Sequence, residues 1–358
     1  MAKIKSSVNS TIEAYDSIKR GMTGDYTPLK TRFEHLNNIT HGGLTKQKIY
    51  TFGALSGFGK SHTLRQIESD IFDEELNPNS KSNVILIKCD WEQTKEEYVL
   101  TKVHEKTGTP FSELLYNEPS DEDQKAFNEV YLELTDDNIY ETFDTFDPDN
   151  FYEEVSKFCK DFKDKDQIVL TIDNANLIDD ENHRGEREAL SVLTKHLIRL
   201  KREIKNLTII LLAQLNRGLK DRSNNPTEQF PRTTDFFASS KIEHASDVMV
   251  VFHNPYMLGI TEYGAVNFEK YRYLEEFLTL KSSYAQFKTK GLVFWHYVKV
   301  RLKNNLKDFK DLFIEKVYEE KESDIKENNF VSQPDFSDSK PNFENVKDVF
   351  GTTNEKPF

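Results

Sequence analysis

Residues 49–66 constrain the fold of this chain more than any other stretch. They read I-Y-T-F-G-A-L-S-G-F-G-K-S-H-T-L-R-Q, which predicts an apolar strand, a glycine-rich turn and a helix that begins at Lys60 and Ser61. In such a turn, backbone N–H groups and the positive end of the helix dipole attract phosphate oxygens. We expect Lys60 to reach the β- and γ-phosphates and the Ser61 hydroxyl to ligate Mg²⁺. The predicted nucleotide-binding residues are Ser56, Gly57, Phe58, Gly59, Lys60, Ser61 and His62.

The strict form of this pattern has glycine at position 54, where this chain has Ala54. An alanine fits there if its backbone has a negative φ, and Gly53, Gly57 and Gly59 remain to provide tight curvature. The alternative interpretation is an ordinary strand–turn–helix corner in which the Lys-Ser pair is accidental.

Composition limits the classes of protein to consider. The 358 residues suffice for one large α/β domain with appendages or for two domains. The balance of 48 basic and 61 acidic residues excludes a uniformly basic nucleic-acid binder, but not a local basic patch. The two cysteines, Cys89 and Cys159, lack C-x-x-C spacing. We therefore expect both to be core residues, in a protein of a reducing compartment. Without an apolar stretch of about 18 residues or a signal-peptide core, we expect a cytoplasmic protein with no membrane partner.

Apolar runs that alternate with amphipathic helices predict βαβ units, and hence an α/β fold with a mostly parallel central sheet flanked by helices. A helix of residues 149–163 is expected to be capped by Asp149 or Asn150. The other predicted helices are residues 94–105 and 187–205, and the predicted strands are 48–52, 84–87, 138–140, 167–172, 207–212, 247–252 and 293–300, the last with 312–315 as its hairpin partner.

Three segments differ in composition. Residues 1–26 contain a predicted amphipathic helix at 8–22, which must bury its apolar face on its own domain or on a neighbouring subunit. Residues 27–318 form the predicted nucleotide-binding domain, in which residues 254–290 are difficult to assign. From residue 319 to 358 the chain is polar and acidic without apolar periodicity, which predicts a disordered tail.

Polar residues directly follow several predicted strands, and ligands of parallel sheets bind at the carboxyl ends of the strands. Asp173 follows Q-I-V-L-T-I and is predicted to hold Mg²⁺ through its water shell. No acid follows it in Asn174-Ala175-Asn176, so the base that activates water must lie elsewhere. Glu92 is the best-placed candidate and Asp90 the second; alternatively Glu92 is a solvated glutamate at a helix start.

Together with Gln214, a candidate sensor of the γ-phosphate, these residues resemble the helicase domain of the DnaB-like replicative helicases, hexameric ring motors with the RecA fold. The similarity covers most of residues 27–315. A-L-S-G-F-G-K-S resembles the family's phosphate loop, in which alanine at the first position is familiar. W-E-Q-T-K-E-E is similar to the segment with the catalytic glutamate, I-D-N-A-N-L-I to the Mg²⁺-binding strand end, and L-L-A-Q-L-N-R to the glutamine sensor motif.

The resemblance implies a RecA-like P-loop NTPase that uses ATP and Mg²⁺. K-V-R at 299–301 looks like the motif through which one subunit completes its neighbour's site, with Lys299 as γ-phosphate sensor and Arg301 as arginine finger. The implied catalytic residues are Lys60, Glu92, Gln214, Lys299 and Arg301. Alternatively, Lys299 and Arg301 are two basic residues that alternate along an edge strand.

The chain also departs from the family pattern. We expect only a linker helix before the motor, with no N-terminal primase-interacting domain, as in a compact bacteriophage form that would act in the host cytoplasm. Where the family's DNA-contacting loop has Arg and Gly, this chain has Phe237 and Ser240. Residues 254–290 are longer than the pattern requires.

DNA binding is implied mainly by the resemblance, and a locally basic loop adds support. In the central channel of a ring, such residues would contact the phosphates of single-stranded DNA without reading sequence; alternatively, the loop is merely solvated. The predicted DNA-binding residues are Arg217, Lys220, Arg222, Arg232 and Lys241. The acidic tail, which ends at Phe358, is a candidate docking segment for a primase, a polymerase or a single-strand-binding protein, or it only aids solubility.

Three functions follow as hypotheses. The first is an ATP-dependent replicative DNA helicase, a hexameric ring that moves 5′→3′ on single-stranded DNA. The second is a RecA-like recombinase that forms filaments, which fits the Q-L-N-R and K-V-R motifs less well. The third is a helicase loader or another ATP switch, which the altered DNA loop keeps open.

Overall fold

The computed structural model describes residues 7–8, 11–12, 15–16, 19, 27–179, 185–222, 228–237, 239–260, 262–263, 266–267, 294–300 and 313–314. The described residues of the predicted N-terminal helix are helical. Arg301, most of the segment 254–290 and the predicted tail lie outside the described residues.

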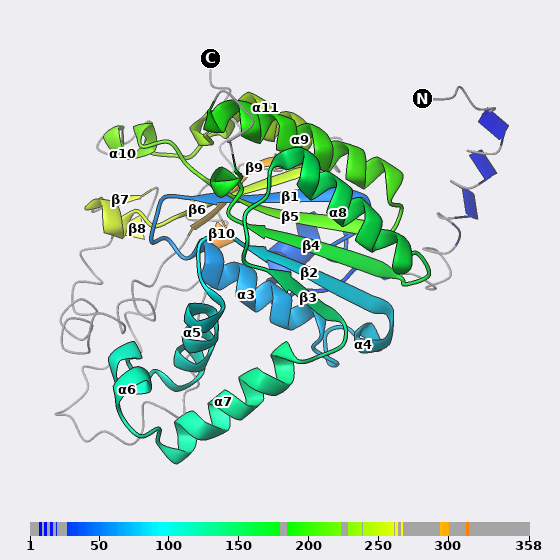
Figure 1. Cartoon of the computed structure of the whole chain (residues 1–358). Helices are drawn as coiled ribbons and strands as arrows, with labels where there is room; N and C mark the ends of the chain where they lie inside the picture. The colour runs from blue at the N-terminus through cyan, green and yellow to red at the C-terminus, as the bar shows by residue number, and fades with distance from the viewer. Residues whose placement is uncertain are drawn as a thin grey trace.

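A mostly parallel sheet forms the centre of the described part of the chain (Figure 1). Its strand order is β10-β9-β6-β1-β5-β4-β2-β3. All neighbours from β6 to β3 pair in parallel, whereas β9 runs antiparallel to β6 and β10 antiparallel to β9. The strands are β1 (Lys48–Ala54), β2 (Val84–Asp90), β3 (Ile139–Thr142), β4 (Gln167–Asp173), β5 (Leu207–Gln214), β6 (Val248–His253), β9 (Phe294–Val300) and β10 (Phe313–Ile314). This arrangement confirms the predicted fold class.

Helices cover both faces of the sheet. Helices α8, α9 and α11 lie over one face and α3 over the other, with α5, α6 and α7 beyond α3 (Figure 1). The helices are α2 (Glu34–Ile39), α3 (Lys60–Ile71), α4 (Ser80–Asn83), α5 (Lys95–Thr107), α6 (Phe111–Tyr116), α7 (Asp121–Leu134), α8 (Pro148–Asp161), α9 (Glu186–Glu203), α10 (Gly218–Asp221) and α11 (Ser239–Ala245). Short 3₁₀ turns are η1 (Ala175–Leu177), η2 (Thr233–Asp235) and η3 (Tyr256–Leu258), and β7 (Glu262–Tyr263) pairs with β8 (Val266–Asn267).

Two apolar clusters hold these layers together. Ile49 of β1 belongs to the cluster beneath α8 and α9, whereas Tyr50 and Phe52 belong to the cluster beneath α3. Successive residues of a strand point to opposite faces, so a strand that is buried on both faces reads as an uninterrupted apolar run. Cys89 and Cys159 are free and buried in the first cluster, as predicted.

The strands extend further toward the functional edge than their apolar runs predict. β2 continues through Lys88 and Cys89 to Asp90, because it pairs with β4 along its whole length. Backbone pairing with a neighbouring strand thus extends β2 beyond the run of apolar side chains. As a result Asp90, Asp173 and Gln214 are the last residues of β2, β4 and β5.

The cap predicted for the helix at 149–163 is wrong. The helix is α8, and its cap is Asp147, whose carboxylate accepts a hydrogen bond from the Asp149 N–H at 3.0 Å. Pro148 occupies the first helical position, where a missing N–H costs no hydrogen bond and the fixed φ favours the helix. The cap therefore precedes the proline.

Candidate active site

The turn between β1 and α3 has the backbone that the phosphate-loop pattern requires. Gly57 and Gly59 have φ of 80° and 86°, in the left-handed region that favours glycine. Ala54, by contrast, is the last residue of β1 and has extended backbone, so an alanine is unstrained there, as expected. α3 begins at Lys60, as predicted.

Gly53 has a packing role rather than the turn role that the sequence suggested. It lies within β1 and has no positive φ. A Cβ at this position would lie 2.4 Å from Cε1 of Phe236, which is too close for any pair of carbon atoms. The missing side chain makes room for Phe236, which forms a bridge to Leu215 at the end of β5.

The side chain of Lys60 is buried close to the carboxylates of the site. Burial lowers the pKa of Lys60, and the negative charges of Asp173 and Glu92 oppose that shift. The ammonium group therefore lies where it can hold an anion between the turn and the strand ends. Glu92 itself is exposed, in the short connection between β2 and α5.

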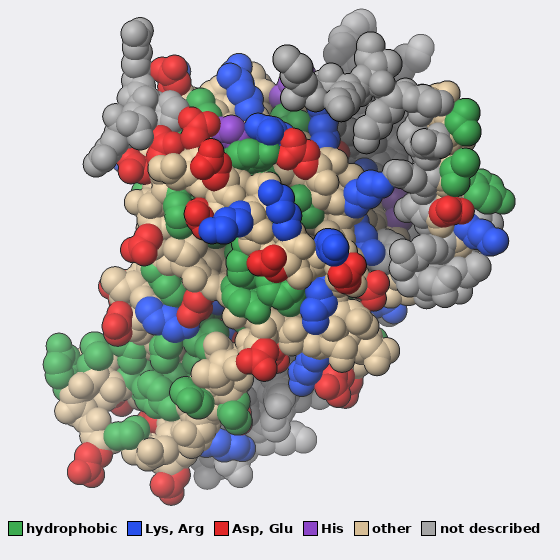
Figure 2. All heavy atoms as spheres, turned by 45° about the vertical axis from the view of Figure 1, so that its right-hand side comes forward, with side chains coloured by type: hydrophobic (Ala, Val, Ile, Leu, Met, Phe, Trp, Pro, Cys, Tyr) green, Lys and Arg blue, Asp and Glu red, His purple; other side chains and the backbone are tan. Residues whose placement is uncertain are grey.

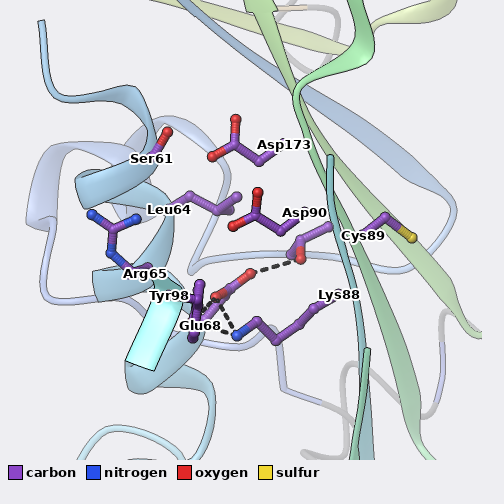
Figure 3. Close-up of a pocket in the computed structure, with 10 residues that line it drawn as sticks. Ser61, Leu64, Arg65, Glu68, Lys88, Cys89, Asp90, Tyr98 and Asp173 are labelled. Carbon is purple, nitrogen blue, oxygen red and sulfur yellow. Dashed lines mark hydrogen bonds and ion pairs between the residues drawn. The ribbon is translucent and has the colours of Figure 1, made fainter. Parts of the chain in front are cut away.

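Asp90 and Asp173 face each other as register partners at the ends of β2 and β4. Burial raises the pKa of Asp173 to about 7, the charge of Asp90 adds to the shift, and a hydrogen bond from Ser61 opposes it. Burial likewise raises the pKa of Asp90 to about 6, against hydrogen bonds from the backbone N–H groups of Glu92 and Gln93. Figure 3 shows both carboxylates on the side of the strands that faces α3.

The donor set here fits Mg²⁺. Oδ1 of Asp173 is buried and has no hydrogen-bond partner among the described residues, and the Ser61 hydroxyl lies beside the same carboxyl. Mg²⁺ prefers hard oxygen ligands and is usually held by one or two protein oxygens together with waters and phosphate oxygens. In the described part of the chain, no group of three or more His, Cys, Asp or Glu side chains is placed to hold a metal ion.

A buried polar network lies below the carboxylates, around a pocket with room for about one water molecule (Figure 3). Glu68 of α3 is its centre and accepts a hydrogen bond from the Thr171 hydroxyl of β4 at 2.7 Å. Its second oxygen lies 3.5 Å from Nζ of Lys88 and accepts a hydrogen bond from the Tyr98 hydroxyl at 3.4 Å. The network therefore joins α3, β2, β4 and α5.

Sequence patterns missed this network, although a charged residue next to an apolar run was a usable signal. Lys88 is only 4% exposed, and burial lowers its pKa. A buried ammonium ion requires a negatively charged partner and hydrogen-bond acceptors; Glu68 provides the charge, and the neutral Tyr98 hydroxyl accepts a hydrogen bond from Lys88. Their identity depends on how α3 and α5 pack on the sheet.

His62, predicted to bind the nucleotide, directs its side chain toward α5. Its Nδ1 lies 2.7 Å from Oε1 of Glu105, and Nη2 of Arg65 lies 2.6 Å from the same oxygen. Burial would raise the pKa of Glu105, but the charge of Arg65 and the bond to His62 outweigh burial and hold that pKa at about 2. The His62 side chain thus ties α3 to α5.

Replacement of Glu105 by Gln should destabilise the fold by about 2 kcal/mol at pH 7, because it leaves Arg65 without its counter-charge. The pKa of Glu105 is lowered in the folded chain from its ordinary value of 4.5 to about 2. Its contribution is therefore complete above pH 4.5 and is lost as the pH falls toward 2. Urea unfolding of both proteins across this range should give a difference that shrinks with acidity.

Glu129→Gln is the matched control. Glu129 pairs with Lys106 at 3.1 Å, but both side chains are more than one-third exposed. Its removal should cost less than about 0.5 kcal/mol at any pH. An equal loss in both variants would contradict the role assigned to Glu105.

Gln214 joins the strand ends to the predicted DNA loop. Its side chain is exposed, its N–H donates to Oδ1 of Asn176 at 3.0 Å, and its carbonyl accepts from the N–H of Phe237 at 3.2 Å. The loop that starts at Asn216 therefore returns to the residue from which it left the sheet. A movement of Gln214 would therefore displace both ends of this loop.

The predicted DNA-binding residues differ in their surroundings. Arg222 forms a two-pronged ion pair with Asp235, at 2.6 and 2.5 Å, and also donates to the carbonyl of Phe230. Arg222 thus holds the loop in shape. The exposed members of the set are Arg217, Lys220, Arg232 and Lys241.

Lys299, predicted to act on a neighbouring subunit, lies on β9 and donates a hydrogen bond to the carbonyl of Glu243 in α11. Arg301 lies outside the described residues. No helix among the described residues has the length and apolar character needed to cross a membrane.

Comparisons with known proteins bear on this arrangement. The solved structure of an ATPase domain matches with a TM-score of 0.61 and 14% identity, over 88% of this chain and 94% of that one. A DnaB-like replicative helicase, solved in a study of its interactions with primase, matches with a TM-score of 0.58 and 14% identity, over 88% of this chain and 64% of that one. At this identity the matches show the fold alone, the RecA-like fold of helicase ATPase domains. No curated protein sequence matches.

A family model decides the assignment. The model described as the DnaB-like helicase C terminal domain matches residues 28–295, about three-quarters of the chain. This range includes the phosphate-loop turn, both carboxylate strand ends and Gln214. The fold and this match agree that the chain belongs to the DnaB-like helicase C-terminal domain family.

Proposed function

We propose that this chain is the motor of a replicative DNA helicase, a hexameric ring that hydrolyses ATP to move along single-stranded DNA and unwind the duplex. The observation that carries the proposal is the convergence of four strand ends. The turn after β1, Glu92 after β2, Asp173 on β4 and Gln214 on β5 meet at the carboxyl edge of one parallel sheet. Family membership supports the replicative role.

In this proposal each residue has a defined task. Lys60 holds the β- and γ-phosphates, and the Ser61 hydroxyl and Asp173 hold Mg²⁺, which when bound neutralises charge on the phosphate oxygens. Glu92 orients the attacking water and accepts its proton, because its exposed carboxyl lies next to the buried pair of aspartates. Lys299 and Arg301 complete the site of a neighbouring subunit.

Coupling to DNA is assigned to the loop that begins after Gln214. The loop continues the chain directly from Gln214, and its far end is hydrogen-bonded back to the Gln214 carbonyl through the N–H of Phe237. A shift of Gln214 toward a γ-phosphate would therefore move Arg217 and Lys220 together. Exposed basic side chains hold DNA by its phosphates, which suits a motor that must step along any sequence.

Two exposed apolar surfaces support assembly from several copies. Val8, Ile12 and Tyr15 are 61%, 54% and 66% exposed, at the spacing of one helical face. The second surface lies on α6 and α7, and Figure 2 shows hydrophobic side chains gathered at that lower end of the molecule. Its members are Phe111, Leu115, Tyr116, Tyr131 and Leu132. We propose that the N-terminal helix of one copy covers this surface of the next.

The test combines ATPase assays with and without single-stranded DNA, particle shape by negative-stain microscopy, and unwinding of a forked duplex. DNA-stimulated hydrolysis, six-fold rings and strand separation are expected. Filaments would indicate a recombinase instead. ATP hydrolysis that single-stranded DNA does not stimulate, together with a lack of unwinding, would indicate a loader or an ATP switch.

Charge reversal at the loop provides a sharper test of the DNA contacts. The double variant Arg217→Glu, Lys220→Glu should bind single-stranded DNA about 10-fold or more weakly, with a salt slope reduced by about 2. Basal ATPase should stay unchanged. The control is the same reversal at Lys160 and Lys163, exposed near the end of α8. Equal effects of both double variants would show that net charge, not this loop, determines binding.

A further inference from the structure

The carboxylate of Asp90 organises the turn that carries Glu92. Its Oδ1 accepts hydrogen bonds from the backbone N–H groups of Glu92 and Gln93, both at 3.1 Å. Aspartate commonly shapes the residues that follow it in this way. Asp90 is only 6% exposed and is held by strand pairing with Asp173, so the acceptor itself is fixed.

Further contacts fix the residues around Glu92. The N–H of Trp91 donates to the carbonyl of Asp173 at 2.6 Å, and its buried ring packs edge-on against Phe151 at a centroid distance of 5.7 Å. Thr94 caps α5 through a reciprocal capping box with Glu97. Glu92 is therefore an exposed side chain on a short segment that is anchored at both ends.

We propose that Asp90 is a positioning residue for Glu92: its carboxylate oxygen holds the backbone of residues 92 and 93, and thereby aims the Glu92 carboxyl at the reacting water. This inference rests on the proposed function and deepens it. It also replaces the alternative in which Asp90 serves as the base itself. Oδ1 of Asp90 accepts two backbone N–H donors, which is the geometry of a carboxylate that holds the following turn, whereas a base directs its carboxylate at the water.

Substitutions at Asp90 separate the two roles. Asp90→Asn keeps an oxygen that accepts the same two hydrogen bonds but cannot act as a base at neutral pH. Asp90→Ala removes the acceptor and frees the turn. If Asp90 positions Glu92, kcat should fall by less than about 5-fold in the Asn variant and by about 100-fold in the Ala variant. KM for ATP should change little in either, since Lys60 and Ser61 are untouched.

The same substitutions in a Glu92→Gln background provide the second readout. A residue that acts through Glu92 loses its effect once Glu92 has been replaced, so Asp90→Ala should lower the residual rate of Glu92→Gln by less than about 2-fold. Thermal unfolding and binding of a non-hydrolysable ATP analogue verify that each variant is folded.

The outcomes are distinct. If the Asn and Ala variants are equally inactive, or if losses at Asp90 and Glu92 multiply, the positioning role is wrong and Asp90 acts directly. If Asp90→Ala retains full activity, the turn does not need it, and the inference fails as well. A wild-type chain that does not hydrolyse ATP would overturn the proposed function itself, which the wild-type control detects separately.

Discussion

Glu92→Gln should lower ATP turnover by about 10²- to 10⁴-fold, the range usual for the loss of a general base. Glutamine matches glutamate in shape but cannot accept the proton of the attacking water. Lys60, Ser61 and Asp173 remain intact, so binding of a fluorescent ATP analogue should keep its affinity. Steady-state hydrolysis and equilibrium binding on the same preparation measure the two effects.

Glu96→Gln is the control for this substitution. Glu96 is also exposed, four residues further along in the first turn of α5, and the variant changes the local charge by the same amount. It should hydrolyse ATP at nearly the wild-type rate. Normal turnover by the Glu92 variant would contradict its assignment as the base, and equal losses in both variants would point to local charge instead.

Equal amounts of Lys60→Ala and Arg301→Ala subunits, each inactive alone, should regain ATPase activity when they are co-expressed. In the proposed ring, the intact Lys60 of one subunit faces the intact Arg301 of its neighbour. If the two subunits mix at random, about one-quarter of the interfaces have both an intact Lys60 and an intact Arg301. ATPase activity should therefore approach a quarter of the wild-type rate. The recovered rate per subunit is the quantity to measure.

The matched control mixes Lys60→Ala with Glu92→Gln. Both residues belong to the same side of the proposed interface, so no arrangement of these two subunits restores a complete site. Activity should stay at the level of the separate variants. An active Arg301→Ala protein, or recovery in both mixtures, would contradict a site shared in this way.

The placement of the candidate residues at strand ends was predictable from local patterns. Apolar runs marked β1, β4 and β5, and the turn after β1, Asp173 on β4 and Gln214 on β5 lie at the carboxyl edge of the sheet, as expected. Gly57 and Gly59 likewise revealed the turn, because their positive φ values disfavour other residues. These signals involve residues within a few positions of one another.

Other features depend on which distant segments become neighbours. The α8 cap shifted to Asp147 for a local reason, whereas Gly53 is required by Phe236, more than 180 residues away in the chain. Arg222 supports its loop because the chain brings Asp235 within hydrogen-bond distance of its guanidinium group. No pattern in a single segment indicates such contacts.

Sequence alone thus determined the phosphate-loop turn, the α/β alternation and the parallel sheet, because hydrophobic periodicity and backbone preference are local properties. The tertiary structure decided what surrounds the turn. It placed β2 beside β4, so that Asp90 faces Asp173, and packed α3 against both, so that Glu68 meets Lys88. Buried charges are tolerated only beside specific partners, and only the packed chain brings those partners together.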